Sequence, residues 1–146
     1  MRKTILVAVS TVALALPSAN AWAAARQILS QTAVKKKVVV ATKTFAGDAA
    51  NADQWGPLQV TIVVRKTTTT IGTKKTVARK ITAVRVPLFP NHTNRSIYIN
   101  QQALPYLVQE TLKAQSSRIY AVSGATNTSD AFAQSLQSAI VHAKAW

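Results

Sequence analysis

The chain has 146 residues and no cysteine, and its 18 Lys and Arg residues stand against four Asp and Glu, a formal net charge of +14. This length suits one domain with a modest core, and the lack of cysteine excludes disulfides, thiolate metal sites and a lipidated cysteine anchor. The four acids and two histidines have no ligand spacing, so no metal site is predicted. The charge predicts association with polyanions, but no nucleic-acid-binding pattern accompanies it, so nucleic acid is not an expected partner.

The first 23 residues have the pattern of a secretory signal peptide. Arg2-Lys3 is a short basic start, Ile5 to Leu16 is apolar, and small residues around Ala21 and Ala23 suit cleavage. The apolar run is shorter than the roughly 20 residues of a bilayer span, and an uncleaved signal anchor is the alternative. We therefore expect an exported protein at the extracytosolic face of the membrane, in the cell wall or in the periplasm.

Two segments follow the signal peptide in the predicted domain organisation. Residues 24–43 combine a tether rich in Ala, Gln, Ser and Thr with a short strand candidate from Val38 to Ala41. Residues 44–146 form the folded domain, which opens with a loop of small residues from Phe45 to Gln54.

The clearest secondary-structure pattern is a long β-hairpin. From Leu58 to Val64 every second residue is apolar, which is the period of a half-buried strand. β-Branched residues continue this strand to a turn at Ile71-Gly72-Thr73, and Lys75 to Val86 returns as a second strand. The basic, Thr-rich tip is either a contact for a polyanion or partner, or a solvated face that keeps the protein soluble.

Two amphipathic helices are predicted in the last third of the chain. A loop from Pro87 to Asn94 and a short strand or bend from Ile97 to Ile99 precede Asn100, which can cap a helix that starts at Leu104-Pro105. The second helix starts near Ser129. Strands followed by helices predict an α+β fold, a curved antiparallel sheet with two main helices packed on one side.

A run of small, hydroxyl-bearing residues from Ser123 to Ser129 lies just ahead of the second helix. Gly124 allows a sharp turn and the close approach of a ligand, and Thr128 or Ser129 can cap the helix. The free N–H groups and the dipole at a helix start favour an anion, and the Thr126 hydroxyl would lie beside a bound phosphate. A polar turn with a good N-cap is the alternative interpretation.

The motif Ser-Gly-Ala-Thr-x-Thr-Ser at 123–129 resembles the signature of the FMN-binding domain family. That family includes the flavin-carrying subunits of sodium-translocating NADH:quinone oxidoreductases and Rnf complexes, and also small exported single-domain proteins, which this chain resembles more. Segments from Trp55 to Ile62, from Lys80 to Val84 and between Arg95 and Ser116 extend the resemblance in the same order. It covers about Thr44 to Ala143.

The resemblance implies that FMN is the cofactor. The residues implied to bind it are Ser123, Gly124, Ala125, Thr126, Thr128, Ser129, Arg95, Ser96 and Asn100. In the family a flavin transferase joins FMN through a phosphoester to the threonine that ends Ser-Gly-Ala-Thr, here Thr126. The acidic residue usual three positions before the motif serine is replaced by Tyr120, so covalent and non-covalent binding both stay open.

Three aromatic side chains are candidates to contact the flavin ring, although each could instead fill the core. They are Trp55, Tyr98 and Tyr120. In the loop before the first helix, Arg95 could reach a phosphate or a ring carbonyl, and His92 is better explained as an exposed loop residue.

The expected function is that of a one-domain extracytosolic flavin electron carrier rather than a complete enzyme. It would work with a membrane redox partner and, for covalent attachment, with a flavin transferase, and anionic cell-envelope polymers are a further expected contact. The alternative is a basic module that binds polyanions or cell wall without a cofactor. A hydrolase that uses Ser123 is disfavoured, because no Gly-x-Ser-x-Gly elbow is present and neither histidine has a readable acid partner.

Overall fold

The structure, a computed structural model, describes residues 35–146. The predicted signal peptide and the tether up to residue 34 lie outside the described residues. The elements in chain order are β1 (Lys36–Ala46), β2 (Ala50–Asn51), the 3-10 turn η1 (Asp53–Trp55), β3 (Pro57–Ile71), β4 (Lys74–Leu88), α2 (Asn94–Ala114) and α3 (Thr126–Lys144). The predicted α+β class, with an antiparallel sheet and two helices, is confirmed.

Strand β3 is the centre of the sheet. Along one edge β1 runs antiparallel to it, with Lys36 opposite Ile71 and Ala46 opposite Thr61, and β2 continues that edge towards the start of β3. Strand β4 pairs with the other edge through the predicted hairpin, with register shifts between Gln59 and Thr61 and between Val63 and Val64. Such irregularities bend a strand and increase its twist, so the sheet is not flat at these positions.

The first strand is longer than the sequence pattern predicted. The apolar run from Val38 to Ala41 is only the middle of β1, and Phe45, placed by the prediction in a loop, belongs to the strand and is buried. The rest of the predicted loop contains β2 and η1. The pattern failed here because Phe45 is the one buried side chain of β1, so the strand has no apolar alternation to read.

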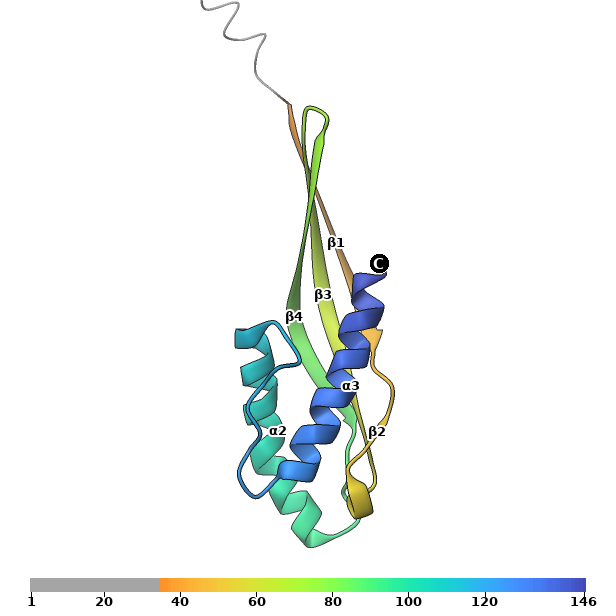
Figure 1. Cartoon of the computed structure of the whole chain (residues 1–146), viewed down its shortest axis with the longest axis vertical. Helices are drawn as coiled ribbons and strands as arrows, with labels where there is room; N and C mark the ends of the chain where they lie inside the picture. The colour runs from red at the N-terminus through yellow and green to blue at the C-terminus, as the bar shows by residue number, and fades with distance from the viewer. Residues whose placement is uncertain (1–34) are drawn as a thin grey trace, which may run out of the picture. The chain divides into compact units, whose positions relative to one another are not determined.

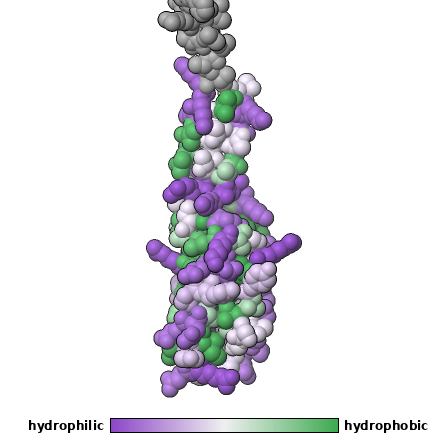
Figure 2. Space-filling view, turned by 90° about the vertical axis from the view of Figure 1, so that its left-hand side faces the viewer, coloured by the Kyte–Doolittle hydropathy of each residue, from purple (hydrophilic) through white to green (hydrophobic). Residues whose placement is uncertain are grey.

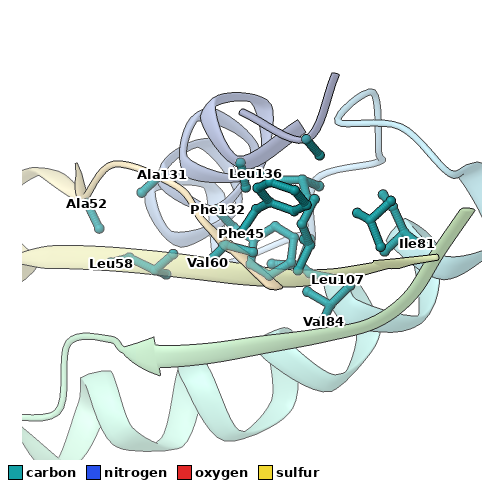
Figure 3. Close-up of a cluster of buried hydrophobic side chains, with 14 residues drawn as sticks. Phe45, Ala52, Leu58, Val60, Ile81, Val84, Leu107, Ala131, Phe132 and Leu136 are labelled. Atoms are coloured by element: carbon teal, nitrogen blue, oxygen red, sulfur yellow. The ribbon is translucent and has the colours of Figure 1, made fainter. Parts of the chain in front are cut away.

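Both helices lie on one face of the sheet (Figure 1). Helix α3 packs across β3 and β1, and α2 packs against β4. The alternating residues predicted for β3 do form the core, since Leu58, Val60 and Ile62 are fully buried. Figure 3 shows Phe132 and Leu136 of α3 meeting this row. Burial of each such large side chain stabilises the fold by about 1.5–3 kcal/mol.

Helix α2 starts ten residues before the predicted position, at Asn94 rather than at Leu104. The predicted short strand or bend at 97–99 and the cap at Asn100 are therefore wrong. Thr93 caps the helix: its Oγ1 accepts from Ser96 N at 3.0 Å, and Ser96 Oγ accepts from Thr93 N at 3.2 Å. Pro105 lies inside the helix, exposed to solvent, and the helix continues past it because residues on its inner face, such as Leu107, are buried.

The helices cover only part of the sheet. Beyond them β1, β3 and β4 continue as a narrow three-stranded ribbon (Figure 1). We call this ribbon the arm and define it as residues 36–42, 65–71 and 74–80. Its apolar side chains are not covered, since Val38, Val39 and Val40 are 49%, 48% and 56% exposed. Among the helices of residues 35–146, none is both long enough and apolar enough to cross a membrane.

Candidate functional site

The Ser123–Ser129 motif forms a tight turn that leads directly into α3. Ala125 N donates to Val122 O at 3.0 Å, and Gly124 has a φ of +80°, a left-handed conformation that glycine adopts without strain. Helix α3 starts at Thr126 and its N-cap is Ala125. The predictions that the helix starts near Ser129 and that Thr128 or Ser129 caps it are therefore wrong.

The two hydroxyls that were predicted as caps, those of Ser129 and Thr128, instead form buried hydrogen bonds that hold the turn in place. Ser129 Oγ accepts from Val122 N at 3.0 Å and donates to Ala125 O at 2.9 Å. Thr128 Oγ1 donates to Asn100 Oδ1 at 3.0 Å. Both side chains are buried, so their hydroxyl groups hold the loop against the helix and are not accessible to solvent.

The first turn of α3 has no side-chain cap. Ala125 carries no side-chain oxygen, and within residues 35–146 no acceptor is found for the backbone N–H groups of Thr126, Asn127 and Thr128. Helix geometry leaves these first N–H groups without an intrahelical partner. Together with the helix dipole they favour an anion by about 0.3–1 kcal/mol at an exposed position.

The first two turns of α2 face this turn of α3. Asn100 is 1% exposed, and its Nδ2 donates to Pro90 O at 2.7 Å while its Oδ1 accepts from Thr128. It therefore joins the loop before α2, α2 itself and the start of α3. One turn earlier, Arg95 is exposed and Ser96 is buried in the α2 cap.

A pocket of about 240 Å³ opens between these two helix starts. Its lining consists of Trp55, Arg95, Ser96, Ile99, Asn100, Gly124, Ala125, Thr126, Asn127 and Thr128. The fold thus brings together most of the site residues that the resemblance implied, although they come from two separate segments. Ser123 lies in the turn outside the lining, and Ser129 lies beneath it.

Sequence reasoning missed two lining residues, Ile99 and Asn127. Ile99 lies one helical turn after Arg95, so the α2 periodicity would have indicated it had the helix start been placed correctly. Asn127 is the unspecified position of the motif, and its Nδ2 lies 3.5 Å from Asp53 Oδ2. No sequence signal predicts that contact.

Of the aromatic side chains predicted to contact a flavin ring, one lies at the pocket. Trp55, in η1, is half-buried and lines it. Tyr98 and Tyr120 do not line it and are 66% and 79% exposed. His92 is exposed and lies outside the lining too.

The groups that line the pocket suit a phosphate. Arg95 is the single charged side chain in the lining, and the free N–H groups of α3 and the exposed Thr126 hydroxyl complete a set of anion donors. Full ligand pockets have roughly 300–1,000 Å³, so a pocket of this size has room for only part of a cofactor-sized ligand. In residues 35–146 no group of three His, Cys, Asp or Glu could hold a metal ion.

Comparison with known proteins identifies the family and its cofactor. The sequence model of a family described as the FMN-binding domain matches residues 53–141. This range runs from η1 through β3, β4 and α2 into the last turns of α3, so it contains every residue that lines the pocket. A search of curated proteins finds no match.

Proposed function

Because this chain belongs to the FMN-binding domain family and its cofactor is FMN, we propose that the phosphate of FMN lies in the pocket between α2 and α3 and that the protein is an exported, one-domain flavin electron carrier. The observation that carries the proposal is the uncapped first turn of α3, which faces Arg95 across the pocket. When FMN is bound, the redox chemistry is supplied by the flavin itself.

Each residue of the pocket has its own role in binding FMN. The N–H groups of Thr126, Asn127 and Thr128 donate to the phosphate, and Arg95 neutralises its charge. Asn100, on α2, is a positioning residue. Its Oδ1 accepts from Thr128 Oγ1 at 3.0 Å, and its Nδ2 donates to Pro90 O at 2.7 Å. Trp55, half-buried in the lining, offers an aromatic face to the ring.

Thr126 is the acceptor if a flavin transferase attaches FMN covalently. Its side chain is exposed and lines the pocket, whereas Thr128 is buried and already donates to Asn100. The step forms a bond from Thr126 Oγ1 to phosphorus, and the hydroxyl proton passes to a base of the transferase. A good leaving group on phosphorus is required, so the donor is a flavin dinucleotide, which releases AMP.

The shallow pocket suits a carrier better than a complete enzyme. A site that encloses one end of its ligand leaves the rest of FMN accessible to a redox partner, which we place in the membrane. No catalytic residue is assigned to the chain. Export rests on the basic, apolar and small-residue pattern of residues 1–23, and an intact Met1 on the mature protein would contradict a cleaved signal peptide.

The proposal is tested by FMN titration of the purified protein, followed by visible absorbance. Arg95→Gln should raise the Kd for FMN about tenfold, because one charge-assisted hydrogen bond at an exposed site contributes about 1.5 kcal/mol. Arg118→Gln, which removes an exposed charge outside the pocket, is the matched control and should leave the Kd unchanged. Wild-type protein that binds no flavin, with or without a transferase, would defeat the assignment.

A further inference from the structure

The arm carries a dense set of cations and no acid. Its eight Lys and Arg residues are Lys36, Lys37, Arg65, Lys66, Lys74, Lys75, Arg79 and Lys80. The four acids of the chain, Asp48, Asp53, Glu110 and Asp130, all lie outside it. Within residues 35–146 the one ion pair joins Lys113 to Glu110 on α2, so the arm has no internal counter-charge.

These cations are divided equally between the two faces of the arm. Phe45 and its partner Ile62 face the helices, and strand side chains alternate, so the face of every arm residue follows from the register. The helix-side face carries Lys37, Lys66, Lys75 and Arg79, and the opposite face carries Lys36, Arg65, Lys74 and Lys80. Figure 2 shows hydrophilic side chains along this narrow end, with hydrophobic ones between them.

Two pairs of these cations lie directly opposite each other on neighbouring strands. Arg65 pairs with Lys80, and Lys66 pairs with Arg79. Like charges in directly opposed positions destabilise a sheet. The repulsion between Lys66 and Arg79 is partly offset, because Lys66 Nζ lies 4.7 Å from the centre of the Trp146 ring and donates to Trp146 O. A bound anion would relieve the repulsion in both pairs.

We propose that the arm binds a flexible linear polymer with phosphate groups along its backbone, and that this polymer contacts both faces. A flat bilayer can meet only one face of a narrow ribbon, whereas a flexible chain can follow the cations around it. The arm contains no aromatic residue on which the bases of a nucleic acid could stack. The polymer is therefore bound through its backbone charges.

The spacing of the cations agrees with such a polymer. On each face the register groups the four cations at two levels. Lys37 and Lys75 flank Thr70 and Lys66 is opposite Arg79, while on the other face Lys36 and Lys74 flank Ile71 and Arg65 is opposite Lys80. At about 3.3 Å per residue, the two levels lie about 13 Å apart on the helix-side face and about 20 Å apart on the opposite face. A polymer with a phosphate in every repeating unit carries charges more closely spaced than these levels, so one flexible chain can contact both levels of a face. Half-buried threonines add hydroxyl donors, Thr69 on the opposite face and Thr70 on the helix-side face.

The arm and the pocket lie at opposite ends of the sheet (Figure 1). The polymer would thus hold the domain at one end and leave the pocket at the other end open. This inference does not depend on the flavin site, because no arm residue lines the pocket.

The test uses the full chain and inorganic polyphosphate as the probe, with Kd measured over a NaCl series. The helix-side variant is Lys37→Gln, Lys66→Gln, Lys75→Gln and Arg79→Gln together, and the opposite-face variant is Lys36→Gln, Arg65→Gln, Lys74→Gln and Lys80→Gln. Each should reduce the slope of log K against log salt by about 3, at about 0.7 per lost contact. A control that removes charges away from the arm, Arg85→Gln, Lys113→Gln and Arg118→Gln together, should change it little.

A smaller variant keeps the test decisive if a quadruple variant fails to fold. Arg65→Gln/Lys80→Gln removes one like-charge pair, so the Tm of the free protein should rise and the gain in Tm on adding polyphosphate should shrink. If the variant and the wild type have the same Tm when free and the same gain in Tm on adding polyphosphate, a bound anion does not relieve this repulsion.

Four outcomes overturn the proposal. Wild-type protein that does not bind polyphosphate has no such site. Tighter binding to phosphatidylglycerol vesicles, with only one face contributing, identifies a membrane surface, and tighter binding to single-stranded DNA at equal phosphate concentration identifies a nucleic acid. Variants that self-associate with unchanged binding show that the charges only protect the exposed strand edges.

Discussion

At the scale of single residues, Thr126 and Thr128 show how about half a turn of helix gives two similar side chains different environments. Thr126 is exposed in the pocket, whereas Thr128 is 6% exposed and hydrogen-bonded to Asn100. The sequence placed both in one hydroxyl-rich motif and predicted the anion site there. It could not distinguish them, because the direction of each side chain depends on where α3 starts.

Exchange of each threonine for valine distinguishes a reactive hydroxyl from a structural one. With the transferase co-expressed, Thr126→Val should lose the FMN adduct and stay within about 0.5 kcal/mol of wild-type stability, as exposed substitutions usually do. Thr128→Val should keep the adduct and lose about 1–3 kcal/mol, because Asn100 Oδ1 is left without its donor. Intact mass and urea unfolding measure the two effects, and the reverse pattern of adducts would move the site to Thr128.

At the scale of the elements, the strands of the central hairpin were predictable and the start of α2 was not. From Leu58 to Val64 every second residue of β3 is apolar, and these four residues are buried. The α2 cap is harder to read, since Ser96 takes the place that Glu or Gln holds in the usual capping box. Pro105 also has the properties of a first-turn residue, and only the burial of α2 against β4 shows that the helix continues through it.

Loss of the α2 cap should lower the affinity of the pocket for FMN as well as the stability of the fold, because the first turn of α2 carries Arg95 and Ser96. We expect Thr93→Ala to lower the free energy of unfolding by about 0.5–2 kcal/mol and to raise the Kd for FMN through a frayed first turn. Thr93→Ser keeps the capping hydroxyl and serves as the control. A stability loss with unchanged FMN affinity would show that Arg95 is positioned independently of the cap.

At the scale of the whole molecule, the sheet is longer than the helices that cover it. The core residues of the strands end at Val64 in β3 and Ile81 in β4, and the arm begins beyond them. The sequence predicted a basic hairpin tip, but the length of sheet left uncovered depends on how far α2 and α3 reach along it.

A shortened hairpin tests whether the two ends of the molecule are independent. Deleting residues 68–77 and joining Thr67 to Ala78 through Asn-Gly keeps the register and supplies a two-residue turn that suits a hairpin. No core residue is removed, so FMN should bind with unchanged Kd. The same protein should bind polyphosphate more weakly, because the deletion removes Lys74 and Lys75 and leaves the first residues of β1 without their β3 partners. Its Tm should fall by only a few degrees, since three strands without a covered apolar face add little independent stability. FMN affinity that fell together with polyphosphate binding would show that the arm and the pocket are one cooperative unit.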